Sequence, residues 1–569
     1  MSEDELALTI DLGTGGPKVG LCTLEGVMLD HEVHSVATNF TGDGGATQDA
    51  EEWWRLIVDS TRRLLARGGI TGARVRAVAV TGQYASTVPV DAQGRPTGPC
   101  LTWLDTRGRP YSKAAIGGPV QGYNPRKALA FVRKTGGGPS PTGADPAGQI
   151  LYLMHDEPDV LSRTRWLMEP VDYLTMRFSG VASATHASRL ALWMTDNRDL
   201  SKYVYDERLL EMIGIDQKFL PPLVPFGSVV GPVTASVADE LGLASDALVT
   251  TGIPDLHAAA LGAGATGLFD MHLALSTTSW ISCPLPAMKT DVKHSIATVP
   301  GLSNDGYLMI NSQDTGAKAL EWLRGVLAGS GESMTFEEMT TLAATSPPGA
   351  RGVLFSPWLA GERSPVGNRS IRAGFSNLSI TTTTPDLIRA VMEGVAANSA
   401  WLFGYVEKFA GRALSPIRLL GGGAQSTLWC QIYADTLSRA APRCSRRGRS
   451  NPTGSQNSLS VRPASTSRPS TTTTTSSERV NSRVSMRATR RGRDGARARQ
   501  RAEAESTVER PPTAPWLPHR TLIKKCRNPR RRDLESTQKG TRCRVLRTMS
   551  PLTSCHYAAV TIGVHADIS

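Results

Sequence analysis

A glycine-rich segment between two predicted strands constrains this 569-residue chain more than any other feature. An apolar run at residues 6–10 leads into the sequence DLGTGG at residues 11–16, and a second apolar run follows at residues 19–24. We therefore expect the glycines to lie in the turn of a β-hairpin. A phosphate-binding P-loop leads from a strand into a helix, so this order of elements argues against a P-loop.

Strands and helices alternate after this hairpin, which indicates an α/β protein. Helical periodicity covers residues 50–67, and a buried strand is expected at residues 74–80. A second round predicts a strand at 248–253, a small-residue helix at 255–264 and one serine- and threonine-rich strand at 273–280. The last regular part is a strand at 417–420, a glycine turn and a helix at 426–437. Hydroxyl-rich turns near residues 11 and 277 form a weak internal repeat, consistent with two related domains closing on one ligand.

The charge is divided sharply along the chain. Residues 441–569 hold 27 Lys or Arg and 8 Asp or Glu, whereas residues 1–440 hold 36 and 43. Apolar periodicity is lost in the basic tail, which indicates disorder or the product of a shifted reading frame. The sparse aromatic residues of the tail, Trp516 and Tyr557, argue against nucleic acid as a partner.

The rest of the composition favours the cytoplasm. The acidic start SEDE at residues 2–5 is not that of a signal or transit peptide, and we find no apolar run long enough to cross a bilayer. The 8 cysteines lack metal-site spacing, so reduced thiols are expected. The oligomeric state stays open, a homodimer included.

Three segments carry candidate chemistry, and each also has a purely structural interpretation. Glycines at 11–16 allow backbone N–H groups to approach phosphates, with Thr14 and Lys18 as further donors and Asp11 as a carboxylate for Mg²⁺. The alternative is a plain hairpin turn. Asp255 is either a helix N-cap or a base that removes a proton from a hydroxyl. The three glycines at 421–423 either lie under a flat base or ribose, or form a tight strand–helix turn.

Taken in order, these segments resemble the FGGY carbohydrate kinases, the family of xylulokinase, gluconokinase and glycerol kinase. The resemblance covers about residues 6–440. It is carried by DLGT at 11–14 with Lys18, QDAEEWW at 48–54, WLDTR at 103–107, PVDYL at 170–174, LAGERSP at 359–365, RAVMEG at 389–394 and LGGGAQS at 420–426. It implies two actin-like (ribonuclease H-like) ATPase domains around a central cleft. We assign the N-terminal, sugar-side domain to residues 1–250, the nucleotide-side domain to 251–440, and the tail to 441–569.

The resemblance implies ATP-dependent phosphorylation of a sugar hydroxyl, with Mg²⁺ and a ketopentose such as xylulose as the expected substrate. Asp255 is the expected catalytic base and Asp11 the expected carboxylate for Mg²⁺. The expected phosphate ligands are Gly13, Thr14, Lys18, Thr277, Thr278 and Ser279; the adenosine pocket is expected at Gly422, Gly423 and Ser426; and the sugar is expected to border Gln83, Tyr84, Trp103 and Asp105. Glu362 and Arg363 are expected to form a buried ion pair that supports the cleft.

The chain also departs from the family pattern. Tyr84 and Ala85 stand where xylulokinases have Met-His, and Thr277 stands at a glycine position, where its branched side chain would resist a positive φ. His257 follows Asp255 closely and either contacts ligand or is satisfied within the helix.

After Ser438 the family's next strand and helix are not recognisable, so we expect an exposed sheet edge. These departures leave a non-catalytic relative that binds sugar or nucleotide without turnover as the alternative. Nucleic-acid binding by the tail ranks below both, and the segments at 103–107 and 359–365 argue against an actin-like chaperone.

Overall fold

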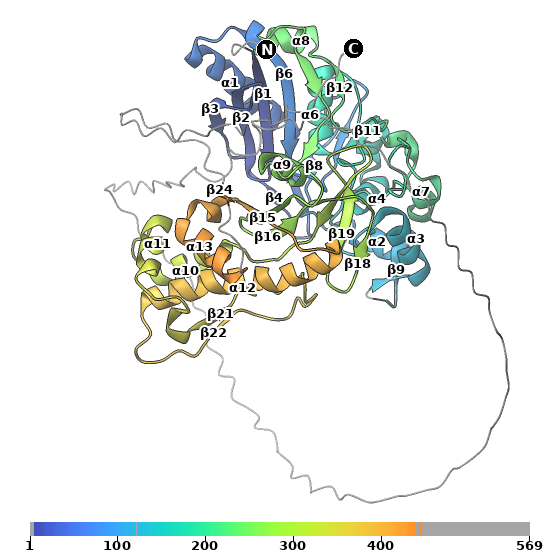
Figure 1. The fold of residues 1–569 in the computed structure, drawn as a ribbon. Helices are drawn as coiled ribbons and strands as arrows, with labels where there is room; N and C mark the ends of the chain where they lie inside the picture. Colours follow the sequence, from blue (N-terminus) through green and yellow to red (C-terminus); the bar gives the residue numbers. More distant parts are fainter. Residues whose placement is uncertain (1–4, 121, 438–442, 445–569) are drawn as a thin grey trace, which may run out of the picture. The chain divides into compact units, whose positions relative to one another are not determined.

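The first part of the fold is a seven-stranded mixed sheet (Figure 1). The computed structural model describes residues 5–120, 122–437 and 443–444. The strand order is β12-β13-β6-β1-β2-β3, with β14 also pairing with β6. The strands are β1 (Leu6–Gly13), β2 (Gly16–Thr23), β3 (Met28–Val33), β6 (Val75–Gly82), β12 (Val229–Pro232), β13 (Leu248–Thr250) and β14 (Ile253–Pro254). β1 pairs antiparallel with β2 and parallel with β6. The predicted hairpin is therefore confirmed.

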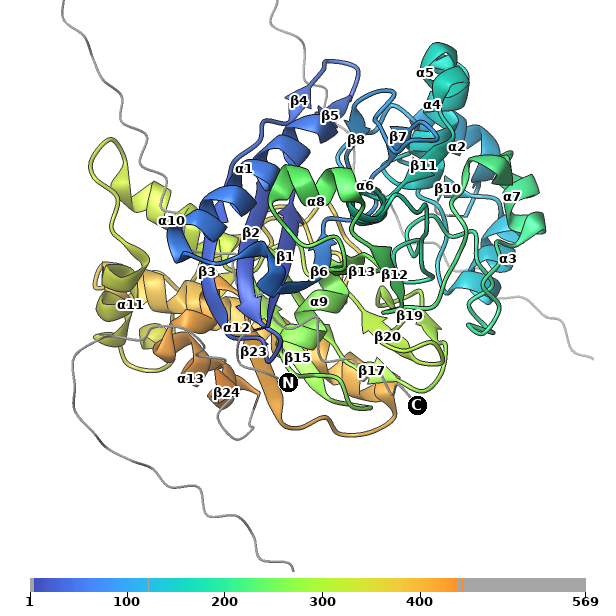
Figure 2. The ribbon, with the colours of Figure 1, turned by 90° about the horizontal axis from the view of Figure 1, so that it is seen from above.

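Three helices cover one face of this sheet, and Figures 1 and 2 show two of them, α1 (Ala50–Gly68) and α8 (Ala235–Leu241), beside the strands. The third is α6 (Pro170–Ser179). The ring centroids of Trp53 on α1 and Tyr173 on α6 lie 6.4 Å apart, and those of Trp54 and Phe178 lie 5.0 Å apart. β1 is buried along almost its whole length because it is central in the sheet, which explains its apolar sequence.

A second, four-stranded sheet has the order β16-β15-β23-β24. Its strands are β15 (Met271–Leu275), β16 (Ser279–Ser282), β23 (Ile417–Leu420) and β24 (Arg443–Cys444). Its helices include α10 (Lys318–Ala328), α11 (Phe336–Ala344), α12 (Thr384–Ala410) and α13 (Thr427–Thr436), and α12 is the long light-orange helix in Figure 1. These helices share one buried apolar cluster with β15, β16 and β23.

Two expectations for this second sheet were wrong. The predicted single strand at 273–280 is a hairpin, since β15 and β16 pair antiparallel around a turn at residues 276–278. An exposed sheet edge was expected because no strand was recognisable after Ser438, but β24 pairs in parallel with β23, Arg418 opposite Arg443 and Leu419 opposite Cys444.

The two sheets repeat one arrangement, because in each a hairpin has its first strand paired in parallel with a later strand. The internal repeat inferred from the hydroxyl-rich turns thus corresponds to matching strand topology. The remaining elements are β4 (Asn39–Phe40), β5 (Ala46–Gln48), β7 (Val88–Val90), β8 (Cys100–Leu101), β9 (Gly117–Gly118), β10 (Gly122–Tyr123), β11 (Trp166–Met168), β17 (Pro284–Leu285), β18 (Thr290–Asp291), β19 (Ile296–Pro300), β20 (Tyr307–Ile310), β21 (Leu354–Ser356), β22 (Gly374–Ser376), α2 (Arg109–Ile116), α3 (Pro125–Thr135), α4 (Pro146–Asp156), α5 (Pro158–Arg163), α7 (Glu207–Ile213) and α9 (Asp255–Gly262).

The α/β, actin-like two-domain fold predicted from the sequence is confirmed. The domain limits at residues 250 and 440 stay predictions, and nearly all of the basic tail lies outside the described residues. Among the helices of the described part, none is both long and apolar enough to cross a bilayer.

Candidate active site

The first hairpin carries a buried ion pair beside its turn. β1 and β2 stay in register up to Gly13 and Gly16, so Thr14 and Gly15 form the tip. Asp11 and Lys18 face each other across the two strands, with 2.8 Å between Lys18 Nζ and Asp11 Oδ2. Burial raises the pKa of Asp11, and the adjacent Lys18 ammonium opposes that shift. The expected phosphate and metal residues of this hairpin therefore lie together.

Strand β6 brings Asp255 next to this hairpin. Gly82, at the end of β6, is the register partner of Leu12 on one side and of Pro254 on the other. Asp11 immediately precedes Leu12, and Asp255 immediately follows Pro254. The two aspartates therefore lie on either side of the end of β6. The backbones of β1 and β6 approach closely at this point, which requires a glycine at position 82. A Cβ on Gly82 would lie 2.5 Å from the backbone oxygen of Leu12.

Asp255 has the electrostatic environment of a base near neutral pH. Asp255 is exposed to solvent, although many protein atoms surround its carboxylate. This burial, and then the Asp11 carboxylate, raise the pKa of Asp255 to about 7, while Lys18 opposes the shift. Solvent contact screens part of the effect. A carboxylate with such a pKa can accept a proton at physiological pH.

Helix α9, which begins at Asp255, connects the two sheets. Its Ala259 packs with Ala274 of β15 and Leu420 of β23, and Ala260 belongs to a cluster with Val299 of β19. The small residues of this helix allow close approach to both neighbours. His257 is fully buried, and its Nε2–H donates to the carbonyl of Pro300 at 2.8 Å. Burial lowers the pKa of His257 to about 4, so this side chain is a neutral part of the packing.

Two of the expected sugar residues lie around the tip of the first hairpin. Trp103 is 45% exposed, and its Nε1–H donates to Thr14 Oγ1 at 2.9 Å. Gln83 is buried and accepts from the Thr14 hydroxyl at 3.2 Å. Tyr84 packs against the apolar cluster that also holds Leu256 of α9. Burial, followed by the charge of Asp255, raises the pKa of Tyr84.

Asp105 is placed differently from these residues. It is fully buried, its Oδ2 accepts from the backbone N–H of Ala46 at 3.0 Å, and it forms an ion pair of 2.7 Å with Arg107. Both carboxylate oxygens are engaged by protein groups. We therefore expect Asp105 to order the loop that carries Trp103.

The second hairpin holds Thr277 and Thr278 at its turn and Ser279 at the start of β16. The turn packs on the next segment, since Gly316 N–H donates to Thr277 O at 2.9 Å. Thr277 has no positive φ, so the strain expected from a threonine at a glycine position does not arise. Thr277 is exposed, whereas Ser279 is 1% exposed and lies behind the turn. Thr277 and Thr278 are thus the accessible hydroxyls of this predicted phosphate loop.

The glycine turn after β23 lies against the second hairpin. Gly421 has φ +91°, and a Cβ there would lie 2.6 Å from Leu275 O. A Cβ on Gly423 would meet the Leu275 side chain at 2.4 Å. Ser426 caps α13 by accepting from Trp429 N–H at 3.2 Å. Close packing therefore accounts for Gly421 and Gly423, and it places the expected adenosine residues beside the second phosphate loop.

The expected ion pair between Glu362 and Arg363 was wrong. Glu362 is fully buried, and its carboxylate accepts from Asn398 Nδ2 at 2.6 Å and from Asp314 N–H at 3.1 Å. The Arg363 guanidinium is instead half exposed and lies 3.3 Å from Asp314 Oδ1. Neighbouring residues on an extended chain point in different directions, so adjacency in sequence did not bring their charges together.

Sequence reasoning assigned no role to Gln48, which lies within the candidate site. It was noted only as the first residue of the QDAEEWW segment at 48–54, which carries part of the family resemblance. Its amide contacts both Thr14 and Gln83. A single glutamine before a helix carries no local signal of such contacts.

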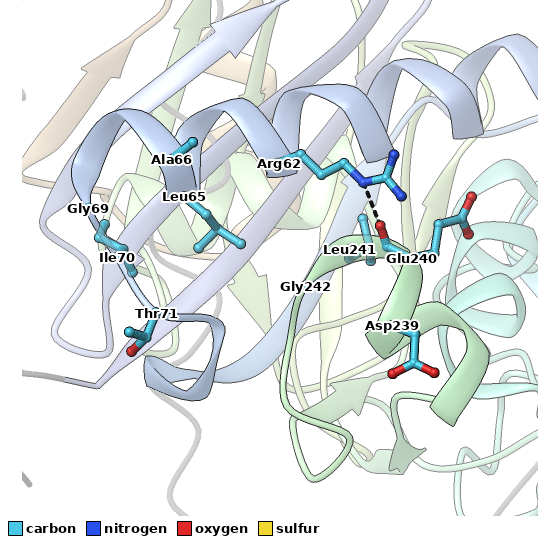
Figure 3. Close-up of a pocket in the computed structure, with 10 residues that line it drawn as sticks. All are labelled: Arg62, Leu65, Ala66, Gly69, Ile70, Thr71, Asp239, Glu240, Leu241 and Gly242. Atoms are coloured by element: carbon cyan, nitrogen blue, oxygen red, sulfur yellow. Dashed lines mark hydrogen bonds between the residues drawn. The ribbon is translucent and has the colours of Figure 1, made fainter.

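A separate hollow of about 410 Å³ lies between the C-terminal end of α1 and α8 (Figure 3). Arg62 Nε donates across it to the backbone oxygen of Glu240 at 2.6 Å. None of the residues expected to bind phosphate, nucleotide or sugar lines it. The candidate site is therefore the pair of hairpins with Asp255, and not this hollow.

The chain is similar in sequence to known proteins. A model of the N-terminal domain of the FGGY family of carbohydrate kinases matches residues 6–262, and a model of its C-terminal domain matches residues 276–446. The xylulose kinase of Staphylococcus epidermidis is 28% identical over 437 residues, covering 76% of this chain and 83% of that protein. The gluconokinase of Bacillus subtilis is 24% identical over 435 residues, covering 75% and 82%.

Solved structures show the same fold. A ligand-bound xylulose kinase from Lactobacillus acidophilus has a TM-score of 0.66 at 22% identity, covering 76% of this chain and 85% of that one. The glycerol kinase of Plasmodium falciparum with ADP has a TM-score of 0.65 at 18% identity, with the same coverage.

Proposed function

This chain belongs to the FGGY family of carbohydrate kinases, and we propose that it transfers the γ-phosphoryl group of ATP to a hydroxyl of a ketopentose such as xylulose, with Asp255 as the general base. Family membership makes the chain a sugar kinase and a phosphotransferase that uses ATP. The sugar, the roles of single residues and the metal are the proposed parts.

The observation that carries the proposal is the position of Asp255 at the end of β6, beside the Asp11–Lys18 pair of the first hairpin. Its pKa of about 7 leaves a large share of the carboxylate ionised at neutral pH, yet makes it a stronger base than an ordinary aspartate. A residue that serves only as a helix N-cap would not need this proximity to a second carboxylate, and Asp255 itself is the first residue of α9, with Pro254 at the N-cap position.

In the proposed reaction, a sugar hydroxyl donates its proton to the Asp255 carboxylate. The sugar oxygen forms a bond to the γ-phosphorus as the bond from phosphorus to the β,γ-bridging oxygen breaks, and ADP leaves with the electron pair. Catalysis of this kind depends on positioning and on neutralising the charge of the phosphoryl oxygens. Lys18 keeps further N–H donors for phosphate beside its bond to Asp11.

The residues present fit a magnesium ion. Nucleotide-bound Mg²⁺ needs only one or two carboxylates, with phosphates and waters as the other ligands. Asp11 and Asp255 supply such oxygens at one strand end, and their like charges raise the pKa of Asp255, which a cation would relieve. Asp11 would hold the ion, which would neutralise phosphate charge in the reaction.

A ketopentose is supported by the relatives named xylulose kinase and by the residues near the hairpin tip. The half-exposed ring of Trp103 offers an apolar face to a sugar, and the charged side chain Asp105 is already neutralised by Arg107. Neither feature favours a negatively charged sugar acid.

The alternative, a relative that binds without turnover, is not supported. It rested on Thr277 at a glycine position and on the strand and helix that are not recognisable after Ser438. Thr277 has no positive φ, and β24 pairs with β23.

The test is ADP release with Mg-ATP and a panel of D-xylulose, D-gluconate and glycerol, comparing the wild type with Asp255→Asn. Asp246→Asn is the matched control, because Asp246 is an exposed carboxylate paired only with Arg76 among its charged neighbours in the described structure. We expect turnover with D-xylulose that Asp255→Asn lowers by at least about a hundredfold and Asp246→Asn leaves unchanged. Turnover with D-gluconate alone would refute the ketopentose, and an active Asp255→Asn enzyme would refute the base.

A further inference from the structure

A single buried glutamine joins the phosphate hairpin to the sugar side of the site. Gln48 ends β5 and is 2% exposed. Its Nε2 donates to the backbone oxygen of Thr14 at 2.7 Å and to Thr38 Oγ1 at 2.9 Å. Its Oε1 accepts from Gln83 Nε2 at 3.2 Å. Gln48 therefore contacts the tip of the first hairpin and a predicted sugar residue at the same time.

These contacts close a ring of hydrogen bonds among Gln48, Gln83 and Thr14. The Thr14 hydroxyl donates to Gln83 Oε1 at 3.2 Å, and Trp103 Nε1–H donates to that hydroxyl at 2.9 Å. The backbone oxygen of Thr14 can only accept, so it fixes Nε2 of Gln48 toward itself. Oε1 of Gln48 must then face Gln83 Nε2, and Oε1 of Gln83 must face the Thr14 hydroxyl. The direction of every bond in the ring follows from this one carbonyl.

The ring gives Thr14 two attachments to the sugar side. Its carbonyl is held through Gln48, and its hydroxyl is held by Gln83 and Trp103. A phosphate bound at the hairpin tip would act on Thr14, and a sugar on the exposed ring of Trp103 would act on the same hydroxyl from the other side. Hydrogen bonds in such a buried network polarise one another, so a change at one member affects the rest.

We propose that Gln48 is a positioning residue that couples occupation of the nucleotide phosphate site to occupation of the sugar site. This inference rests on the proposed function, because it takes the hairpin tip as the phosphate site and Trp103 as a border of the sugar. Gln48 itself touches neither substrate and acts through Thr14 and Gln83. Coupling between two sites changes each affinity by about 5- to 150-fold in proteins where it has been measured.

The experiment measures this coupling as binding, without turnover. The dissociation constant of D-xylulose is determined by calorimetry with and without Mg²⁺ and the β,γ-imido analogue of ATP, and the reverse titration is done for the analogue. We expect each ligand to tighten the other by at least about fivefold in the wild type. In Gln48→Leu the ratio should fall to about one, because both the donor to Thr14 and the acceptor for Gln83 are lost.

Two further variants separate coupling from folding. Thr38→Val removes the other acceptor of Gln48 but leaves the ring intact, so it should keep the wild-type ratio. Gln48→Glu keeps an acceptor for Gln83 but, as a carboxylate, cannot donate to the Thr14 carbonyl, so it should lose the coupling even if Gln48→Leu fails to fold.

An equal ratio in the wild type and either Gln48 variant, or a wild-type ratio of one, would overturn the inference. Failure of the proposed substrate looks different: the analogue binds and D-xylulose does not. In that case the same titrations use D-gluconate or glycerol, whichever the kinase panel selects, and the coupling is judged with that probe.

Discussion

The pH dependence of the sugar kinase reaction tests the role of Asp255 most directly. If its carboxylate removes the proton from the sugar hydroxyl, kcat/KM follows the ionised fraction of Asp255 in the free enzyme. With a pKa of about 7, about one tenth of the enzyme is ionised at pH 6 and about nine tenths at pH 8. We therefore expect kcat/KM to rise about tenfold from pH 6 to pH 8 and then level off.

The tenfold rise in kcat/KM is expected only because the surroundings of Asp255 raise its pKa. An ordinary aspartate has a pKa of about 3.9 and would be fully ionised throughout this range, so the rate would not change. Burial and the neighbouring Asp11 carboxylate produce the shift, and the sign follows because both disfavour the charged form.

The assay is coupled ADP release at constant ionic strength, with both Mg-ATP and the sugar limiting, so that the rate reports the pKa of Asp255 in the free enzyme. Asp255→Asn is measured in parallel, because titration of the nucleotide phosphates would persist in that variant whereas titration of the base would not. Asp246→Asn should keep the wild-type profile. A flat wild-type profile between pH 6 and 8, or the same rise in the residual activity of Asp255→Asn, would refute the reasoning.

Three predictions concern stability and use thermal or denaturant unfolding. Burial raises the pKa of Glu169 to about 8, so its stabilising protonation is lost as the pH rises from about 4.5 toward 8. The Tm of Glu169→Gln should therefore fall less over that range, and parallel Tm curves would contradict this. Gly82→Ala should destabilise by about 1–3 kcal/mol because its Cβ meets backbone at 2.5 Å. Gly231→Ala, with no atom within 4 Å, should change little, and equal effects would reject the packing argument. Arg107→Met should cost about 3 kcal/mol by leaving buried Asp105 without its ion-pair partner, and an unchanged free energy of unfolding would refute this.

The sequence determined those parts of the fold whose signal is local. Apolar runs on both sides of DLGTGG specify the first hairpin, and helical periodicity specifies α1, which spans Ala50–Gly68 against a predicted 50–67. The same holds for β23 and α13 around the glycine turn. In each case the residues that set the element are its own, so reading them in order was enough.

A hydroxyl-rich turn near residue 277 was expected, but the two strands of the second hairpin could not be told apart in this way. Threonine favours extended structure, and the run at residues 276–279 contains no glycine or proline to mark a turn. The turn is set by a distant segment, since Gly316 and Gln313 provide its backbone hydrogen-bond partners. A local pattern therefore predicted one strand where tertiary contacts make two.

The chemistry of the site was decided by the tertiary structure alone. The residue types were visible in sequence, but the pKa of Asp255 depends on burial and then on Asp11, and only their shared neighbour β6 brings the two carboxylates together. Likewise Arg363 pairs with Asp314 instead of adjacent Glu362, and Gln48 gains its contacts only after β5 lies beside the hairpin. Electrostatic and hydrogen-bond energies depend on distance in space, which the order of residues along the chain does not contain.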